Sequence, residues 1–204
     1  HQNNLMWIDA LIWLPILVWS IEELIKKRHY KMFVISLSMT MLSNYYIGYM
    51  VCIFSLVYFF YYYFSQDPKV LNPHGKRAHL FRAFVRFALF ALLSAAIAAF
   101  IIFGAYYSLT FGKSTFSDPN WSFRVKFDFL DFFTKFLPGA YDTVRPEGLP
   151  FVYCGLLTLL MLPVYFTSRS VSTREKLASL FLIGFFFLSF LASPLDLIWH
   201  GFQN

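Results

Sequence analysis

Two long stretches of the sequence carry no charge, and they restrict the chain to a small set of folds. Residues 87–109 and residues 177–195 contain no Asp, Glu, Lys or Arg. A helix of about 20 apolar residues crosses the roughly 30 Å hydrocarbon layer of a bilayer. Hydrophobic residues make up 58% of the chain and charged residues only 14%, which is unlike an ordinary soluble domain. The sequence therefore predicts an integral membrane protein.

The apolar runs and their breakers predict an all-α fold, a polytopic transmembrane helical bundle of about six spans. Lipid cannot satisfy backbone polar groups, so spanning segments must be helical. The expected spans form a single membrane domain over residues 1–204, with a long outer loop at 110–150. In this loop FRVKFDFLDFFTKFL repeats phenylalanine at helical spacing, which predicts an amphipathic helix at the interface. The spans cover residues 5–21, 32–42, 47–64, 87–109, 151–167 and 177–195.

Basic residues concentrate in alternate connections between these spans. Residues 22–31, 65–86 and 168–176 hold twelve of the 17 lysines and arginines. The positive-inside rule places these connections in the cytoplasm, where they also meet anionic lipid. The net charge of +6 therefore needs no nucleic-acid partner, and none is expected.

The segment MLSNYYIGYM, residues 41–50, places polar side chains inside an otherwise apolar run. The span before Asn44 covers about 16 Å of helix, so the turn lies below the outer surface. Its backbone must then be covered by protein or line a watery cavity. We therefore predict that Asn44, Tyr45 and Tyr46 line an outward-facing cavity. The alternative is a simple turn residue followed by ordinary interfacial aromatics.

Further polar positions fall on the same outer side. Asp9 lies in an apolar helix, where a carboxylate lines a cavity or snorkels to the surface. SPLDLIWHGFQN places Asp196 and His200 one helical turn apart, where they can hold a proton or a ligand together, or simply end a helix. Arg145 in the long loop offers a fork for a phosphate, or lies solvated. No His, Cys and carboxylate cluster has metal-ligand spacing, so no metal site is expected.

Four stretches together resemble the YfhO family of bacterial membrane proteins, in order and over nearly the whole chain. They are NNLMWIDALIWLPILVWSIEELI, LSNYYIGYMVCIFSLVYFF, FVYCGLLTLLMLPVYF with STREKL, and LDLIWHGF. The resemblance implies a multi-pass protein of the Gram-positive plasma membrane, similar to C-type glycosyltransferases. Such enzymes move a sugar from a polyprenyl-phosphate carrier to an acceptor outside the membrane. The implied acceptor is a cell-envelope polymer, such as lipoteichoic acid. The residues expected to bind donor or acceptor are Asp9, Asn44, Tyr45, Tyr46, Arg145, Asp196 and His200.

The chain departs from the C-type pattern at its start. Those enzymes carry a catalytic Asp in the first outer loop, whereas this chain opens on HQNN and is expected to be a central piece that begins after that loop. The main catalytic base is therefore expected outside it, and the piece alone is expected to be inactive. A transporter or flippase of lipid-linked sugars and a noncatalytic scaffold remain alternatives. A transporter needs polar positions in the cytoplasmic half of its spans, and that half reads as apolar except for Ser55 and Ser179, which favours the enzyme.

Overall fold

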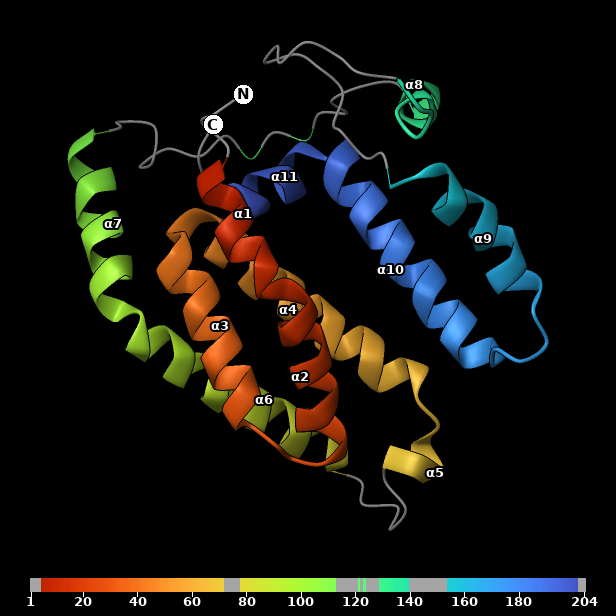
Figure 1. Cartoon of the computed structure of the whole chain (residues 1–204), viewed down its shortest axis with the longest axis horizontal. Coiled ribbons are helices and arrows are strands. Elements are labelled where there is room, and N and C mark those ends of the chain that lie inside the picture. Colours follow the sequence, from red (N-terminus) through yellow and green to blue (C-terminus); the bar gives the residue numbers. More distant parts are fainter. Residues whose placement is uncertain are drawn as a thin grey trace. The chain divides into compact units, whose positions relative to one another are not determined.

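The structure, a computed structural model, is built of α-helices, as the sequence predicts (Figure 1). It describes residues 5–71, 78–112, 121, 123, 129–139 and 154–201. The helices are α1 (Leu5–Ile12), α2 (Leu14–Lys26), α3 (Lys31–Ser43), α4 (Tyr45–Ser65), α5 (Pro68–Leu71), α6 (His79–Ile97), α7 (Ala99–Gly112), α8 (Phe129–Thr134), α9 (Leu156–Thr167), α10 (Thr173–Leu191) and α11 (Ser193–Trp199).

The chain divides into two compact units. Unit 1 comprises His1–Pro119 and Trp199–Asn204, and unit 2 comprises Asn120–Ile198. Each unit is described by itself below. A single membrane domain stays a prediction.

Three of the expected spans are each divided between two helices in the structure. The run 5–21 breaks after Ile12, and α2 restarts with Pro15 in its first turn, where a missing N–H costs nothing. The run 177–195 breaks at Ala192, because Ser193 and Pro194 begin α11. The run 87–109 breaks at Ala98.

Ser94 supplies a physical reason for the break at Ala98. Its hydroxyl donates to the carbonyl of Phe90 at 2.9 Å, four residues back on the same helix. Such back-bonding often bends helices, and the bend here follows one turn later.

Helix α6 also begins at His79, eight residues before the expected span, so that it includes Arg82 and Arg86.

Two of the described helices, α4 and α6, are long and apolar enough to cross a membrane. Shorter apolar helices cover Lys31–Ser43, Ala99–Ser108 and Leu156–Thr167. Helix α6 exposes Phe81, Leu89 and Leu92, each at least 60% accessible. A lipid-facing helix carries such an apolar surface, whereas the core helix of a soluble protein buries it. The total of six spans stays a prediction.

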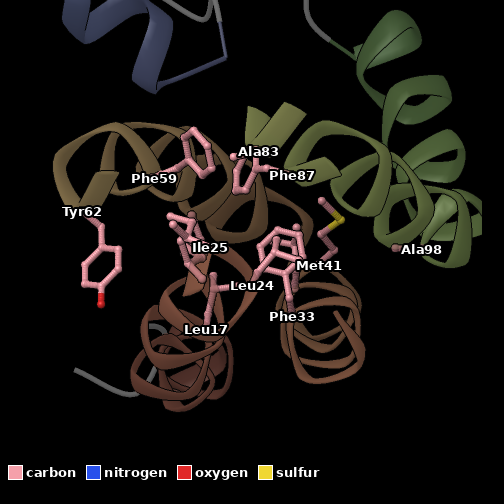
Figure 2. Packing of buried hydrophobic residues seen from close by; sticks show 13 residues of the cluster. Leu17, Leu24, Ile25, Phe33, Met41, Phe59, Tyr62, Ala83, Phe87 and Ala98 are labelled. Atoms are coloured by element: carbon pink, nitrogen blue, oxygen red, sulfur yellow. The ribbon is translucent and has the colours of Figure 1, made fainter. Parts of the chain in front are cut away.

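The core of unit 1 lies between α2, α3, α4 and α6 (Figure 2). Phe87 of α6 is its aromatic centre: its ring lies 5.2 Å from that of Phe33 on α3 and 4.9 Å from that of Phe59 on α4. Aromatic pairs at such separations stabilise a fold by about 0.5–1.5 kcal/mol, in addition to the stabilisation from the apolar area that they bury. Leu17 and Leu24 close the core from α2 and are at most 1% exposed.

Helix α3 contacts its neighbours through small hydroxyl residues. Ser36 meets Ser20 of α2 with a hydroxyl separation of 3.4 Å, and the Ser94 hydroxyl of α6, which donates to Phe90, also lies 3.4 Å from the carbonyl oxygen of Val34. These serines are fully buried. Small residues let helix backbones approach closely, which is how membrane helices gain packing energy without a hydrophobic driving force.

In unit 2, α9 and α10 form an antiparallel hairpin (Figure 1). The hydroxyls of Tyr165 and Ser179 lie 2.8 Å apart across it. Ser172 caps α10 by accepting from the backbone N–H of Glu175 at 3.2 Å, a favoured N-cap arrangement.

The expected amphipathic helix is present in part, as α8, whose Phe133 ring lies 6.1 Å from that of Phe187 on α10. Residues 124–128 of the expected helix lie outside the described part of the chain. Its place at the membrane interface stays a prediction.

Candidate functional site

The candidate site begins at Asn44, the single residue that joins α3 to α4. Its backbone is extended, with φ −157° and ψ 117°, so it ends one helix and caps the next. The side-chain oxygen Oδ1 accepts from the N–H groups of Tyr46 at 3.0 Å and Ile47 at 3.1 Å. Two otherwise orphaned donors of α4 are satisfied in this way. The polar interruption in the sequence is therefore, first, a helix cap.

Gly48 explains how so short a connection can join two packed helices. A Cβ at this position would lie 2.8 Å from Cα of Met41 on α3, and real Cβ contacts are essentially never that short. The missing side chain lets the two backbones approach at the turn. Glycine here serves close packing, as in other membrane helix pairs.

The second part of the site is the tail that follows α11. Gly201 has φ 65°, a left-handed conformation that suits glycine and commonly ends a helix. A Cβ there would lie 3.8 Å from the ring of Tyr49, so the tail runs beside α4. The ring centroid of His200 lies 6.3 Å from that of Tyr46 at an interplanar angle of 52°. Unit 1 thus brings together segments more than 150 residues apart in sequence.

This arrangement offers hydrogen-bonding groups beside aromatic surface. The two ring nitrogens of His200 and the phenol oxygen of Tyr46 are able to donate to or accept from hydroxyl and phosphate groups. Both residues are half-buried. Part of a polar ligand is therefore able to reach them from the surroundings.

The other predicted residues are placed as follows. Tyr45 opens α4 beside the cap and is 43% exposed. Asp9 is exposed on α1, a helix that contacts α3 and α4. Asp196 lies in the first turn of α11, within unit 2. Arg145 lies outside the described residues. The structure therefore brings Tyr46 and His200 together at the first turn of α4, beside the Asn44 cap.

Sequence reasoning missed a polar cluster toward the other end of the bundle. The Tyr58 hydroxyl on α4 donates to Oε1 of Glu22 on α2 at 2.9 Å. One turn further along α4, Lys26 Nζ lies 5.1 Å from the ring centroid of Tyr62, a cation–π geometry. Glu22 fell just beyond the expected end of the first span. An acidic residue followed four positions later by a lysine was the signal available in the sequence.

The apolar cytoplasmic half of the spans stays a prediction. At the end of unit 1 where the Glu22–Tyr58 hydrogen bond lies, Ser20 and Ser36 are also buried. Both serines bond to carbonyls of their own helices, at 2.7 Å to Leu17 and 2.8 Å to Met32. Hydroxyls satisfied within their helices contribute to packing. They do not by themselves form a path across the membrane.

Within the part of the chain that the structure describes, no three His, Cys, Asp or Glu side chains gather as a metal site would require.

Comparison with known proteins places these features in a family. The family model described as bacterial membrane protein YfhO matches residues 1–204. A curated relative, named Uncharacterized protein YfhO of Bacillus subtilis (strain 168), is 25% identical over 195 residues, which cover 96% of this chain and 20% of that protein. The chain thus spans about a fifth of the length of that relative. No solved structure matches it.

Proposed function

Because the chain belongs to the YfhO family of bacterial membrane proteins, we propose that it is part of a membrane glycosyltransferase. The whole protein moves a sugar from a polyprenyl-phosphate carrier to a cell-envelope polymer, such as lipoteichoic acid, on the outer face of the plasma membrane. The main catalytic base lies outside this chain, which contributes binding residues.

One observation carries the proposal: the tail after α11 runs beside the turn at Asn44. The half-buried rings of His200 and Tyr46 therefore lie next to each other. In the predicted orientation this turn faces outward. A reaction between a lipid-linked donor and an envelope acceptor requires a half-buried polar site at that depth, open to lipid on one side and to water on the other. The half-buried residues Asn44, Tyr46 and His200 support a site of this kind at the turn.

The residues have separate proposed roles. Asn44 holds the turn as a cap, and Tyr45 and Tyr46 present phenol groups beside it. His200 binds a phosphate or sugar hydroxyl opposite Tyr46. Asp9, Asp196 and Arg145 are further candidates for binding donor or acceptor, and an arginine offers a phosphate a bidentate fork.

The orientation is also part of the proposal. Six spans place the connections 22–31, 65–86 and 168–176 in the cytoplasm and the Asn44 turn outside. Single cysteines at Lys27 and Tyr45, in a parent protein lacking its native cysteines, test this with a membrane-impermeant thiol reagent on intact cells. Labelling at position 45 alone is expected. Labelling at position 27 alone would reverse the orientation and remove the site from the outer face.

The test of function uses the full-length parent in a strain that lacks it. His200→Ala and Tyr46→Phe are compared with wild type for the amount of sugar on the purified envelope polymer, at matched membrane levels. Loss of one polar partner of a bound substrate is expected to lower transfer by about tenfold or more. His29→Ala is the matched control, because His29 lies in a cytoplasmic connection and is exposed. Normal sugar in both site variants would refute the proposed site.

A flippase of lipid-linked sugars is a second candidate, favoured by the Glu22–Tyr58 hydrogen bond in the cytoplasmic half of the helices. The two functions differ in what accumulates when the protein is absent. A missing transferase leaves the loaded carrier on the outer leaflet, and a missing flippase leaves it on the inner leaflet. Accessibility of the carrier sugar to an impermeant oxidant in intact cells separates them.

A further inference from the structure

The connection between α2 and α3 is held against α6 in an unusual backbone conformation. The ring of Tyr30 stacks on that of Phe90 of α6, with centroids 4.4 Å apart and an interplanar angle of 4°. Two residues earlier, Arg28 has φ 63°, in the left-handed region that costs a residue with a side chain about 1–2 kcal/mol. Strain of this kind at a non-glycine residue persists where the surrounding structure fixes it, often for function.

Arg86 lies one helical turn before Phe90 and therefore on the same face of α6 as the Tyr30 stack. The Tyr30 stack, with the contact between Ser94 and Val34 one turn further along α6 and α3, brings the connection that carries Arg28 alongside the part of α6 that carries Arg86. Arg82 follows one turn further along the same face. The three arginines thus come from two elements, the α2–α3 connection and the first half of α6, which lie at the same end of unit 1 (Figure 1).

No carboxylate of the described residues neutralises Arg28 or Arg86. The carboxylate of Glu23 is paired with Lys27, whose Nζ lies 3.0 Å from Oε1, and its Oε2 lies 3.6 Å from Nδ1 of His29. Glu22 accepts from Tyr58 instead. Two like charges held together without a counter-ion repel each other, particularly beside apolar surface. The arrangement therefore favours an anion that binds between the two arginines.

The surface beside the arginines indicates which anion. Phe81, Val85 and Leu89 follow one another at four-residue spacing on α6 and are 68%, 37% and 60% exposed. This apolar stripe adjoins the arginine face on a helix that is long enough to cross a membrane. A phospholipid supplies both a phosphate for the guanidinium groups and acyl chains for the stripe, whereas free phosphate supplies only the first.

We propose that Arg28 and Arg86 form a binding site for the phosphate of an anionic phospholipid in the cytoplasmic leaflet, with its acyl chains along the exposed stripe of α6. The site lies at the opposite end of unit 1 from the Asn44 turn. It depends on the membrane setting and the predicted orientation, and it is independent of the proposed sugar transfer.

The test measures lipid retained by the purified full-length parent. Detergent-solubilised protein is incubated with phosphatidylglycerol or with phosphatidylcholine, and bound lipid is counted by native mass spectrometry. Removing one arginine charge near the membrane surface is expected to weaken phosphatidylglycerol binding about fivefold. Arg28→Gln and Arg86→Gln are therefore each expected to lose most of the preference for phosphatidylglycerol over phosphatidylcholine.

The control is Arg169→Gln, which removes an exposed arginine from the connection between α9 and α10 and is expected to keep the preference. Arg28→Gln is informative even if Arg86→Gln disturbs α6, because Arg28 is exposed and lies outside any helix. Unchanged lipid preference in both site variants would overturn the proposal. Displacement of phosphatidylglycerol by inorganic phosphate at similar concentration would overturn the choice of a lipid.

Discussion

Replacing Gly48 with alanine tests the close approach of α3 and α4 at the candidate site. The new Cβ would lie 2.8 Å from Cα and 3.3 Å from N of Met41, against 3.4–4 Å for an ordinary contact. Because the nearest atom belongs to the backbone, rotation of a side chain cannot relieve the clash. The helices must separate by roughly 0.6 Å, and overpacking of this kind costs about 1–3 kcal/mol. Alanine regains up to about 1 kcal/mol of helix propensity.

We therefore expect Gly48→Ala to destabilise the protein by about 1–2 kcal/mol. The assay is thermal unfolding of the detergent-solubilised parent, followed by loss of the monodisperse protein on heating. Gly104→Ala and Gly184→Ala are matched controls, since a Cβ at either position meets nothing within 4 Å. The thermal stability of both control variants is expected to equal or exceed that of the wild-type protein. Equal stability of Gly48→Ala and the two controls would refute the close approach and, with it, the geometry of the turn.

Three further predictions concern single hydrogen-bonding groups, each measured in the same unfolding assay. Asn44→Ala is expected to lose about 1 kcal/mol of stability through the lost cap, whereas Asn44→Asp keeps the accepting oxygen and most of the stability; equal loss in both variants would contradict the capping role. Tyr58→Phe is expected to lose about 1–3 kcal/mol because it leaves the half-buried carboxylate of Glu22 without this donor, and no change would show that water replaces the bond. Tyr62→Phe is expected to lose less stability than Tyr58→Phe, since the Tyr58 hydroxyl makes the close hydrogen bond to Glu22 and the Tyr62 hydroxyl makes none of comparable length, and an equal loss would contradict this ranking.

The fold class was predictable from the sequence because uncharged runs of membrane length leave the backbone no alternative to helix. The junction between α3 and α4 was predictable for a related reason: Asn44 is a turn residue that interrupts an apolar run. The packing role of Gly48 is visible only in the structure. The breaks at Trp13, Ala98 and Ala192 were not all equally visible. Proline marks the first and last, whereas the break at Ala98 follows a serine hydroxyl that bonds within its own helix, and an apolar count gives no sign of it.

The candidate site was predictable only in part, because its residues come from distant segments. Composition placed Asn44, Tyr46 and His200 on one predicted side of the membrane, yet only the fold shows that the tail meets α4. Gly201 also lies beside Tyr49, a neighbour that no spacing rule predicts. Glu22 and Tyr58 were missed because their hydrogen bond depends on the packing of α2 against α4.

The structure also separates two kinds of polar residue that a sequence treats alike. The Oδ1 atom of Asn44 already accepts two backbone N–H groups, so removing it disturbs the start of α4 whether or not a ligand binds. Lost activity in Asn44→Ala is therefore ambiguous between folding and binding. His200 and Tyr46 meet through their rings, whose centroids lie 6.3 Å apart. The exchange Tyr46→Phe keeps this ring contact and removes only the hydroxyl, so at normal protein level it reports on ligand binding more directly than Asn44→Ala, and the assignment of the site depends on it.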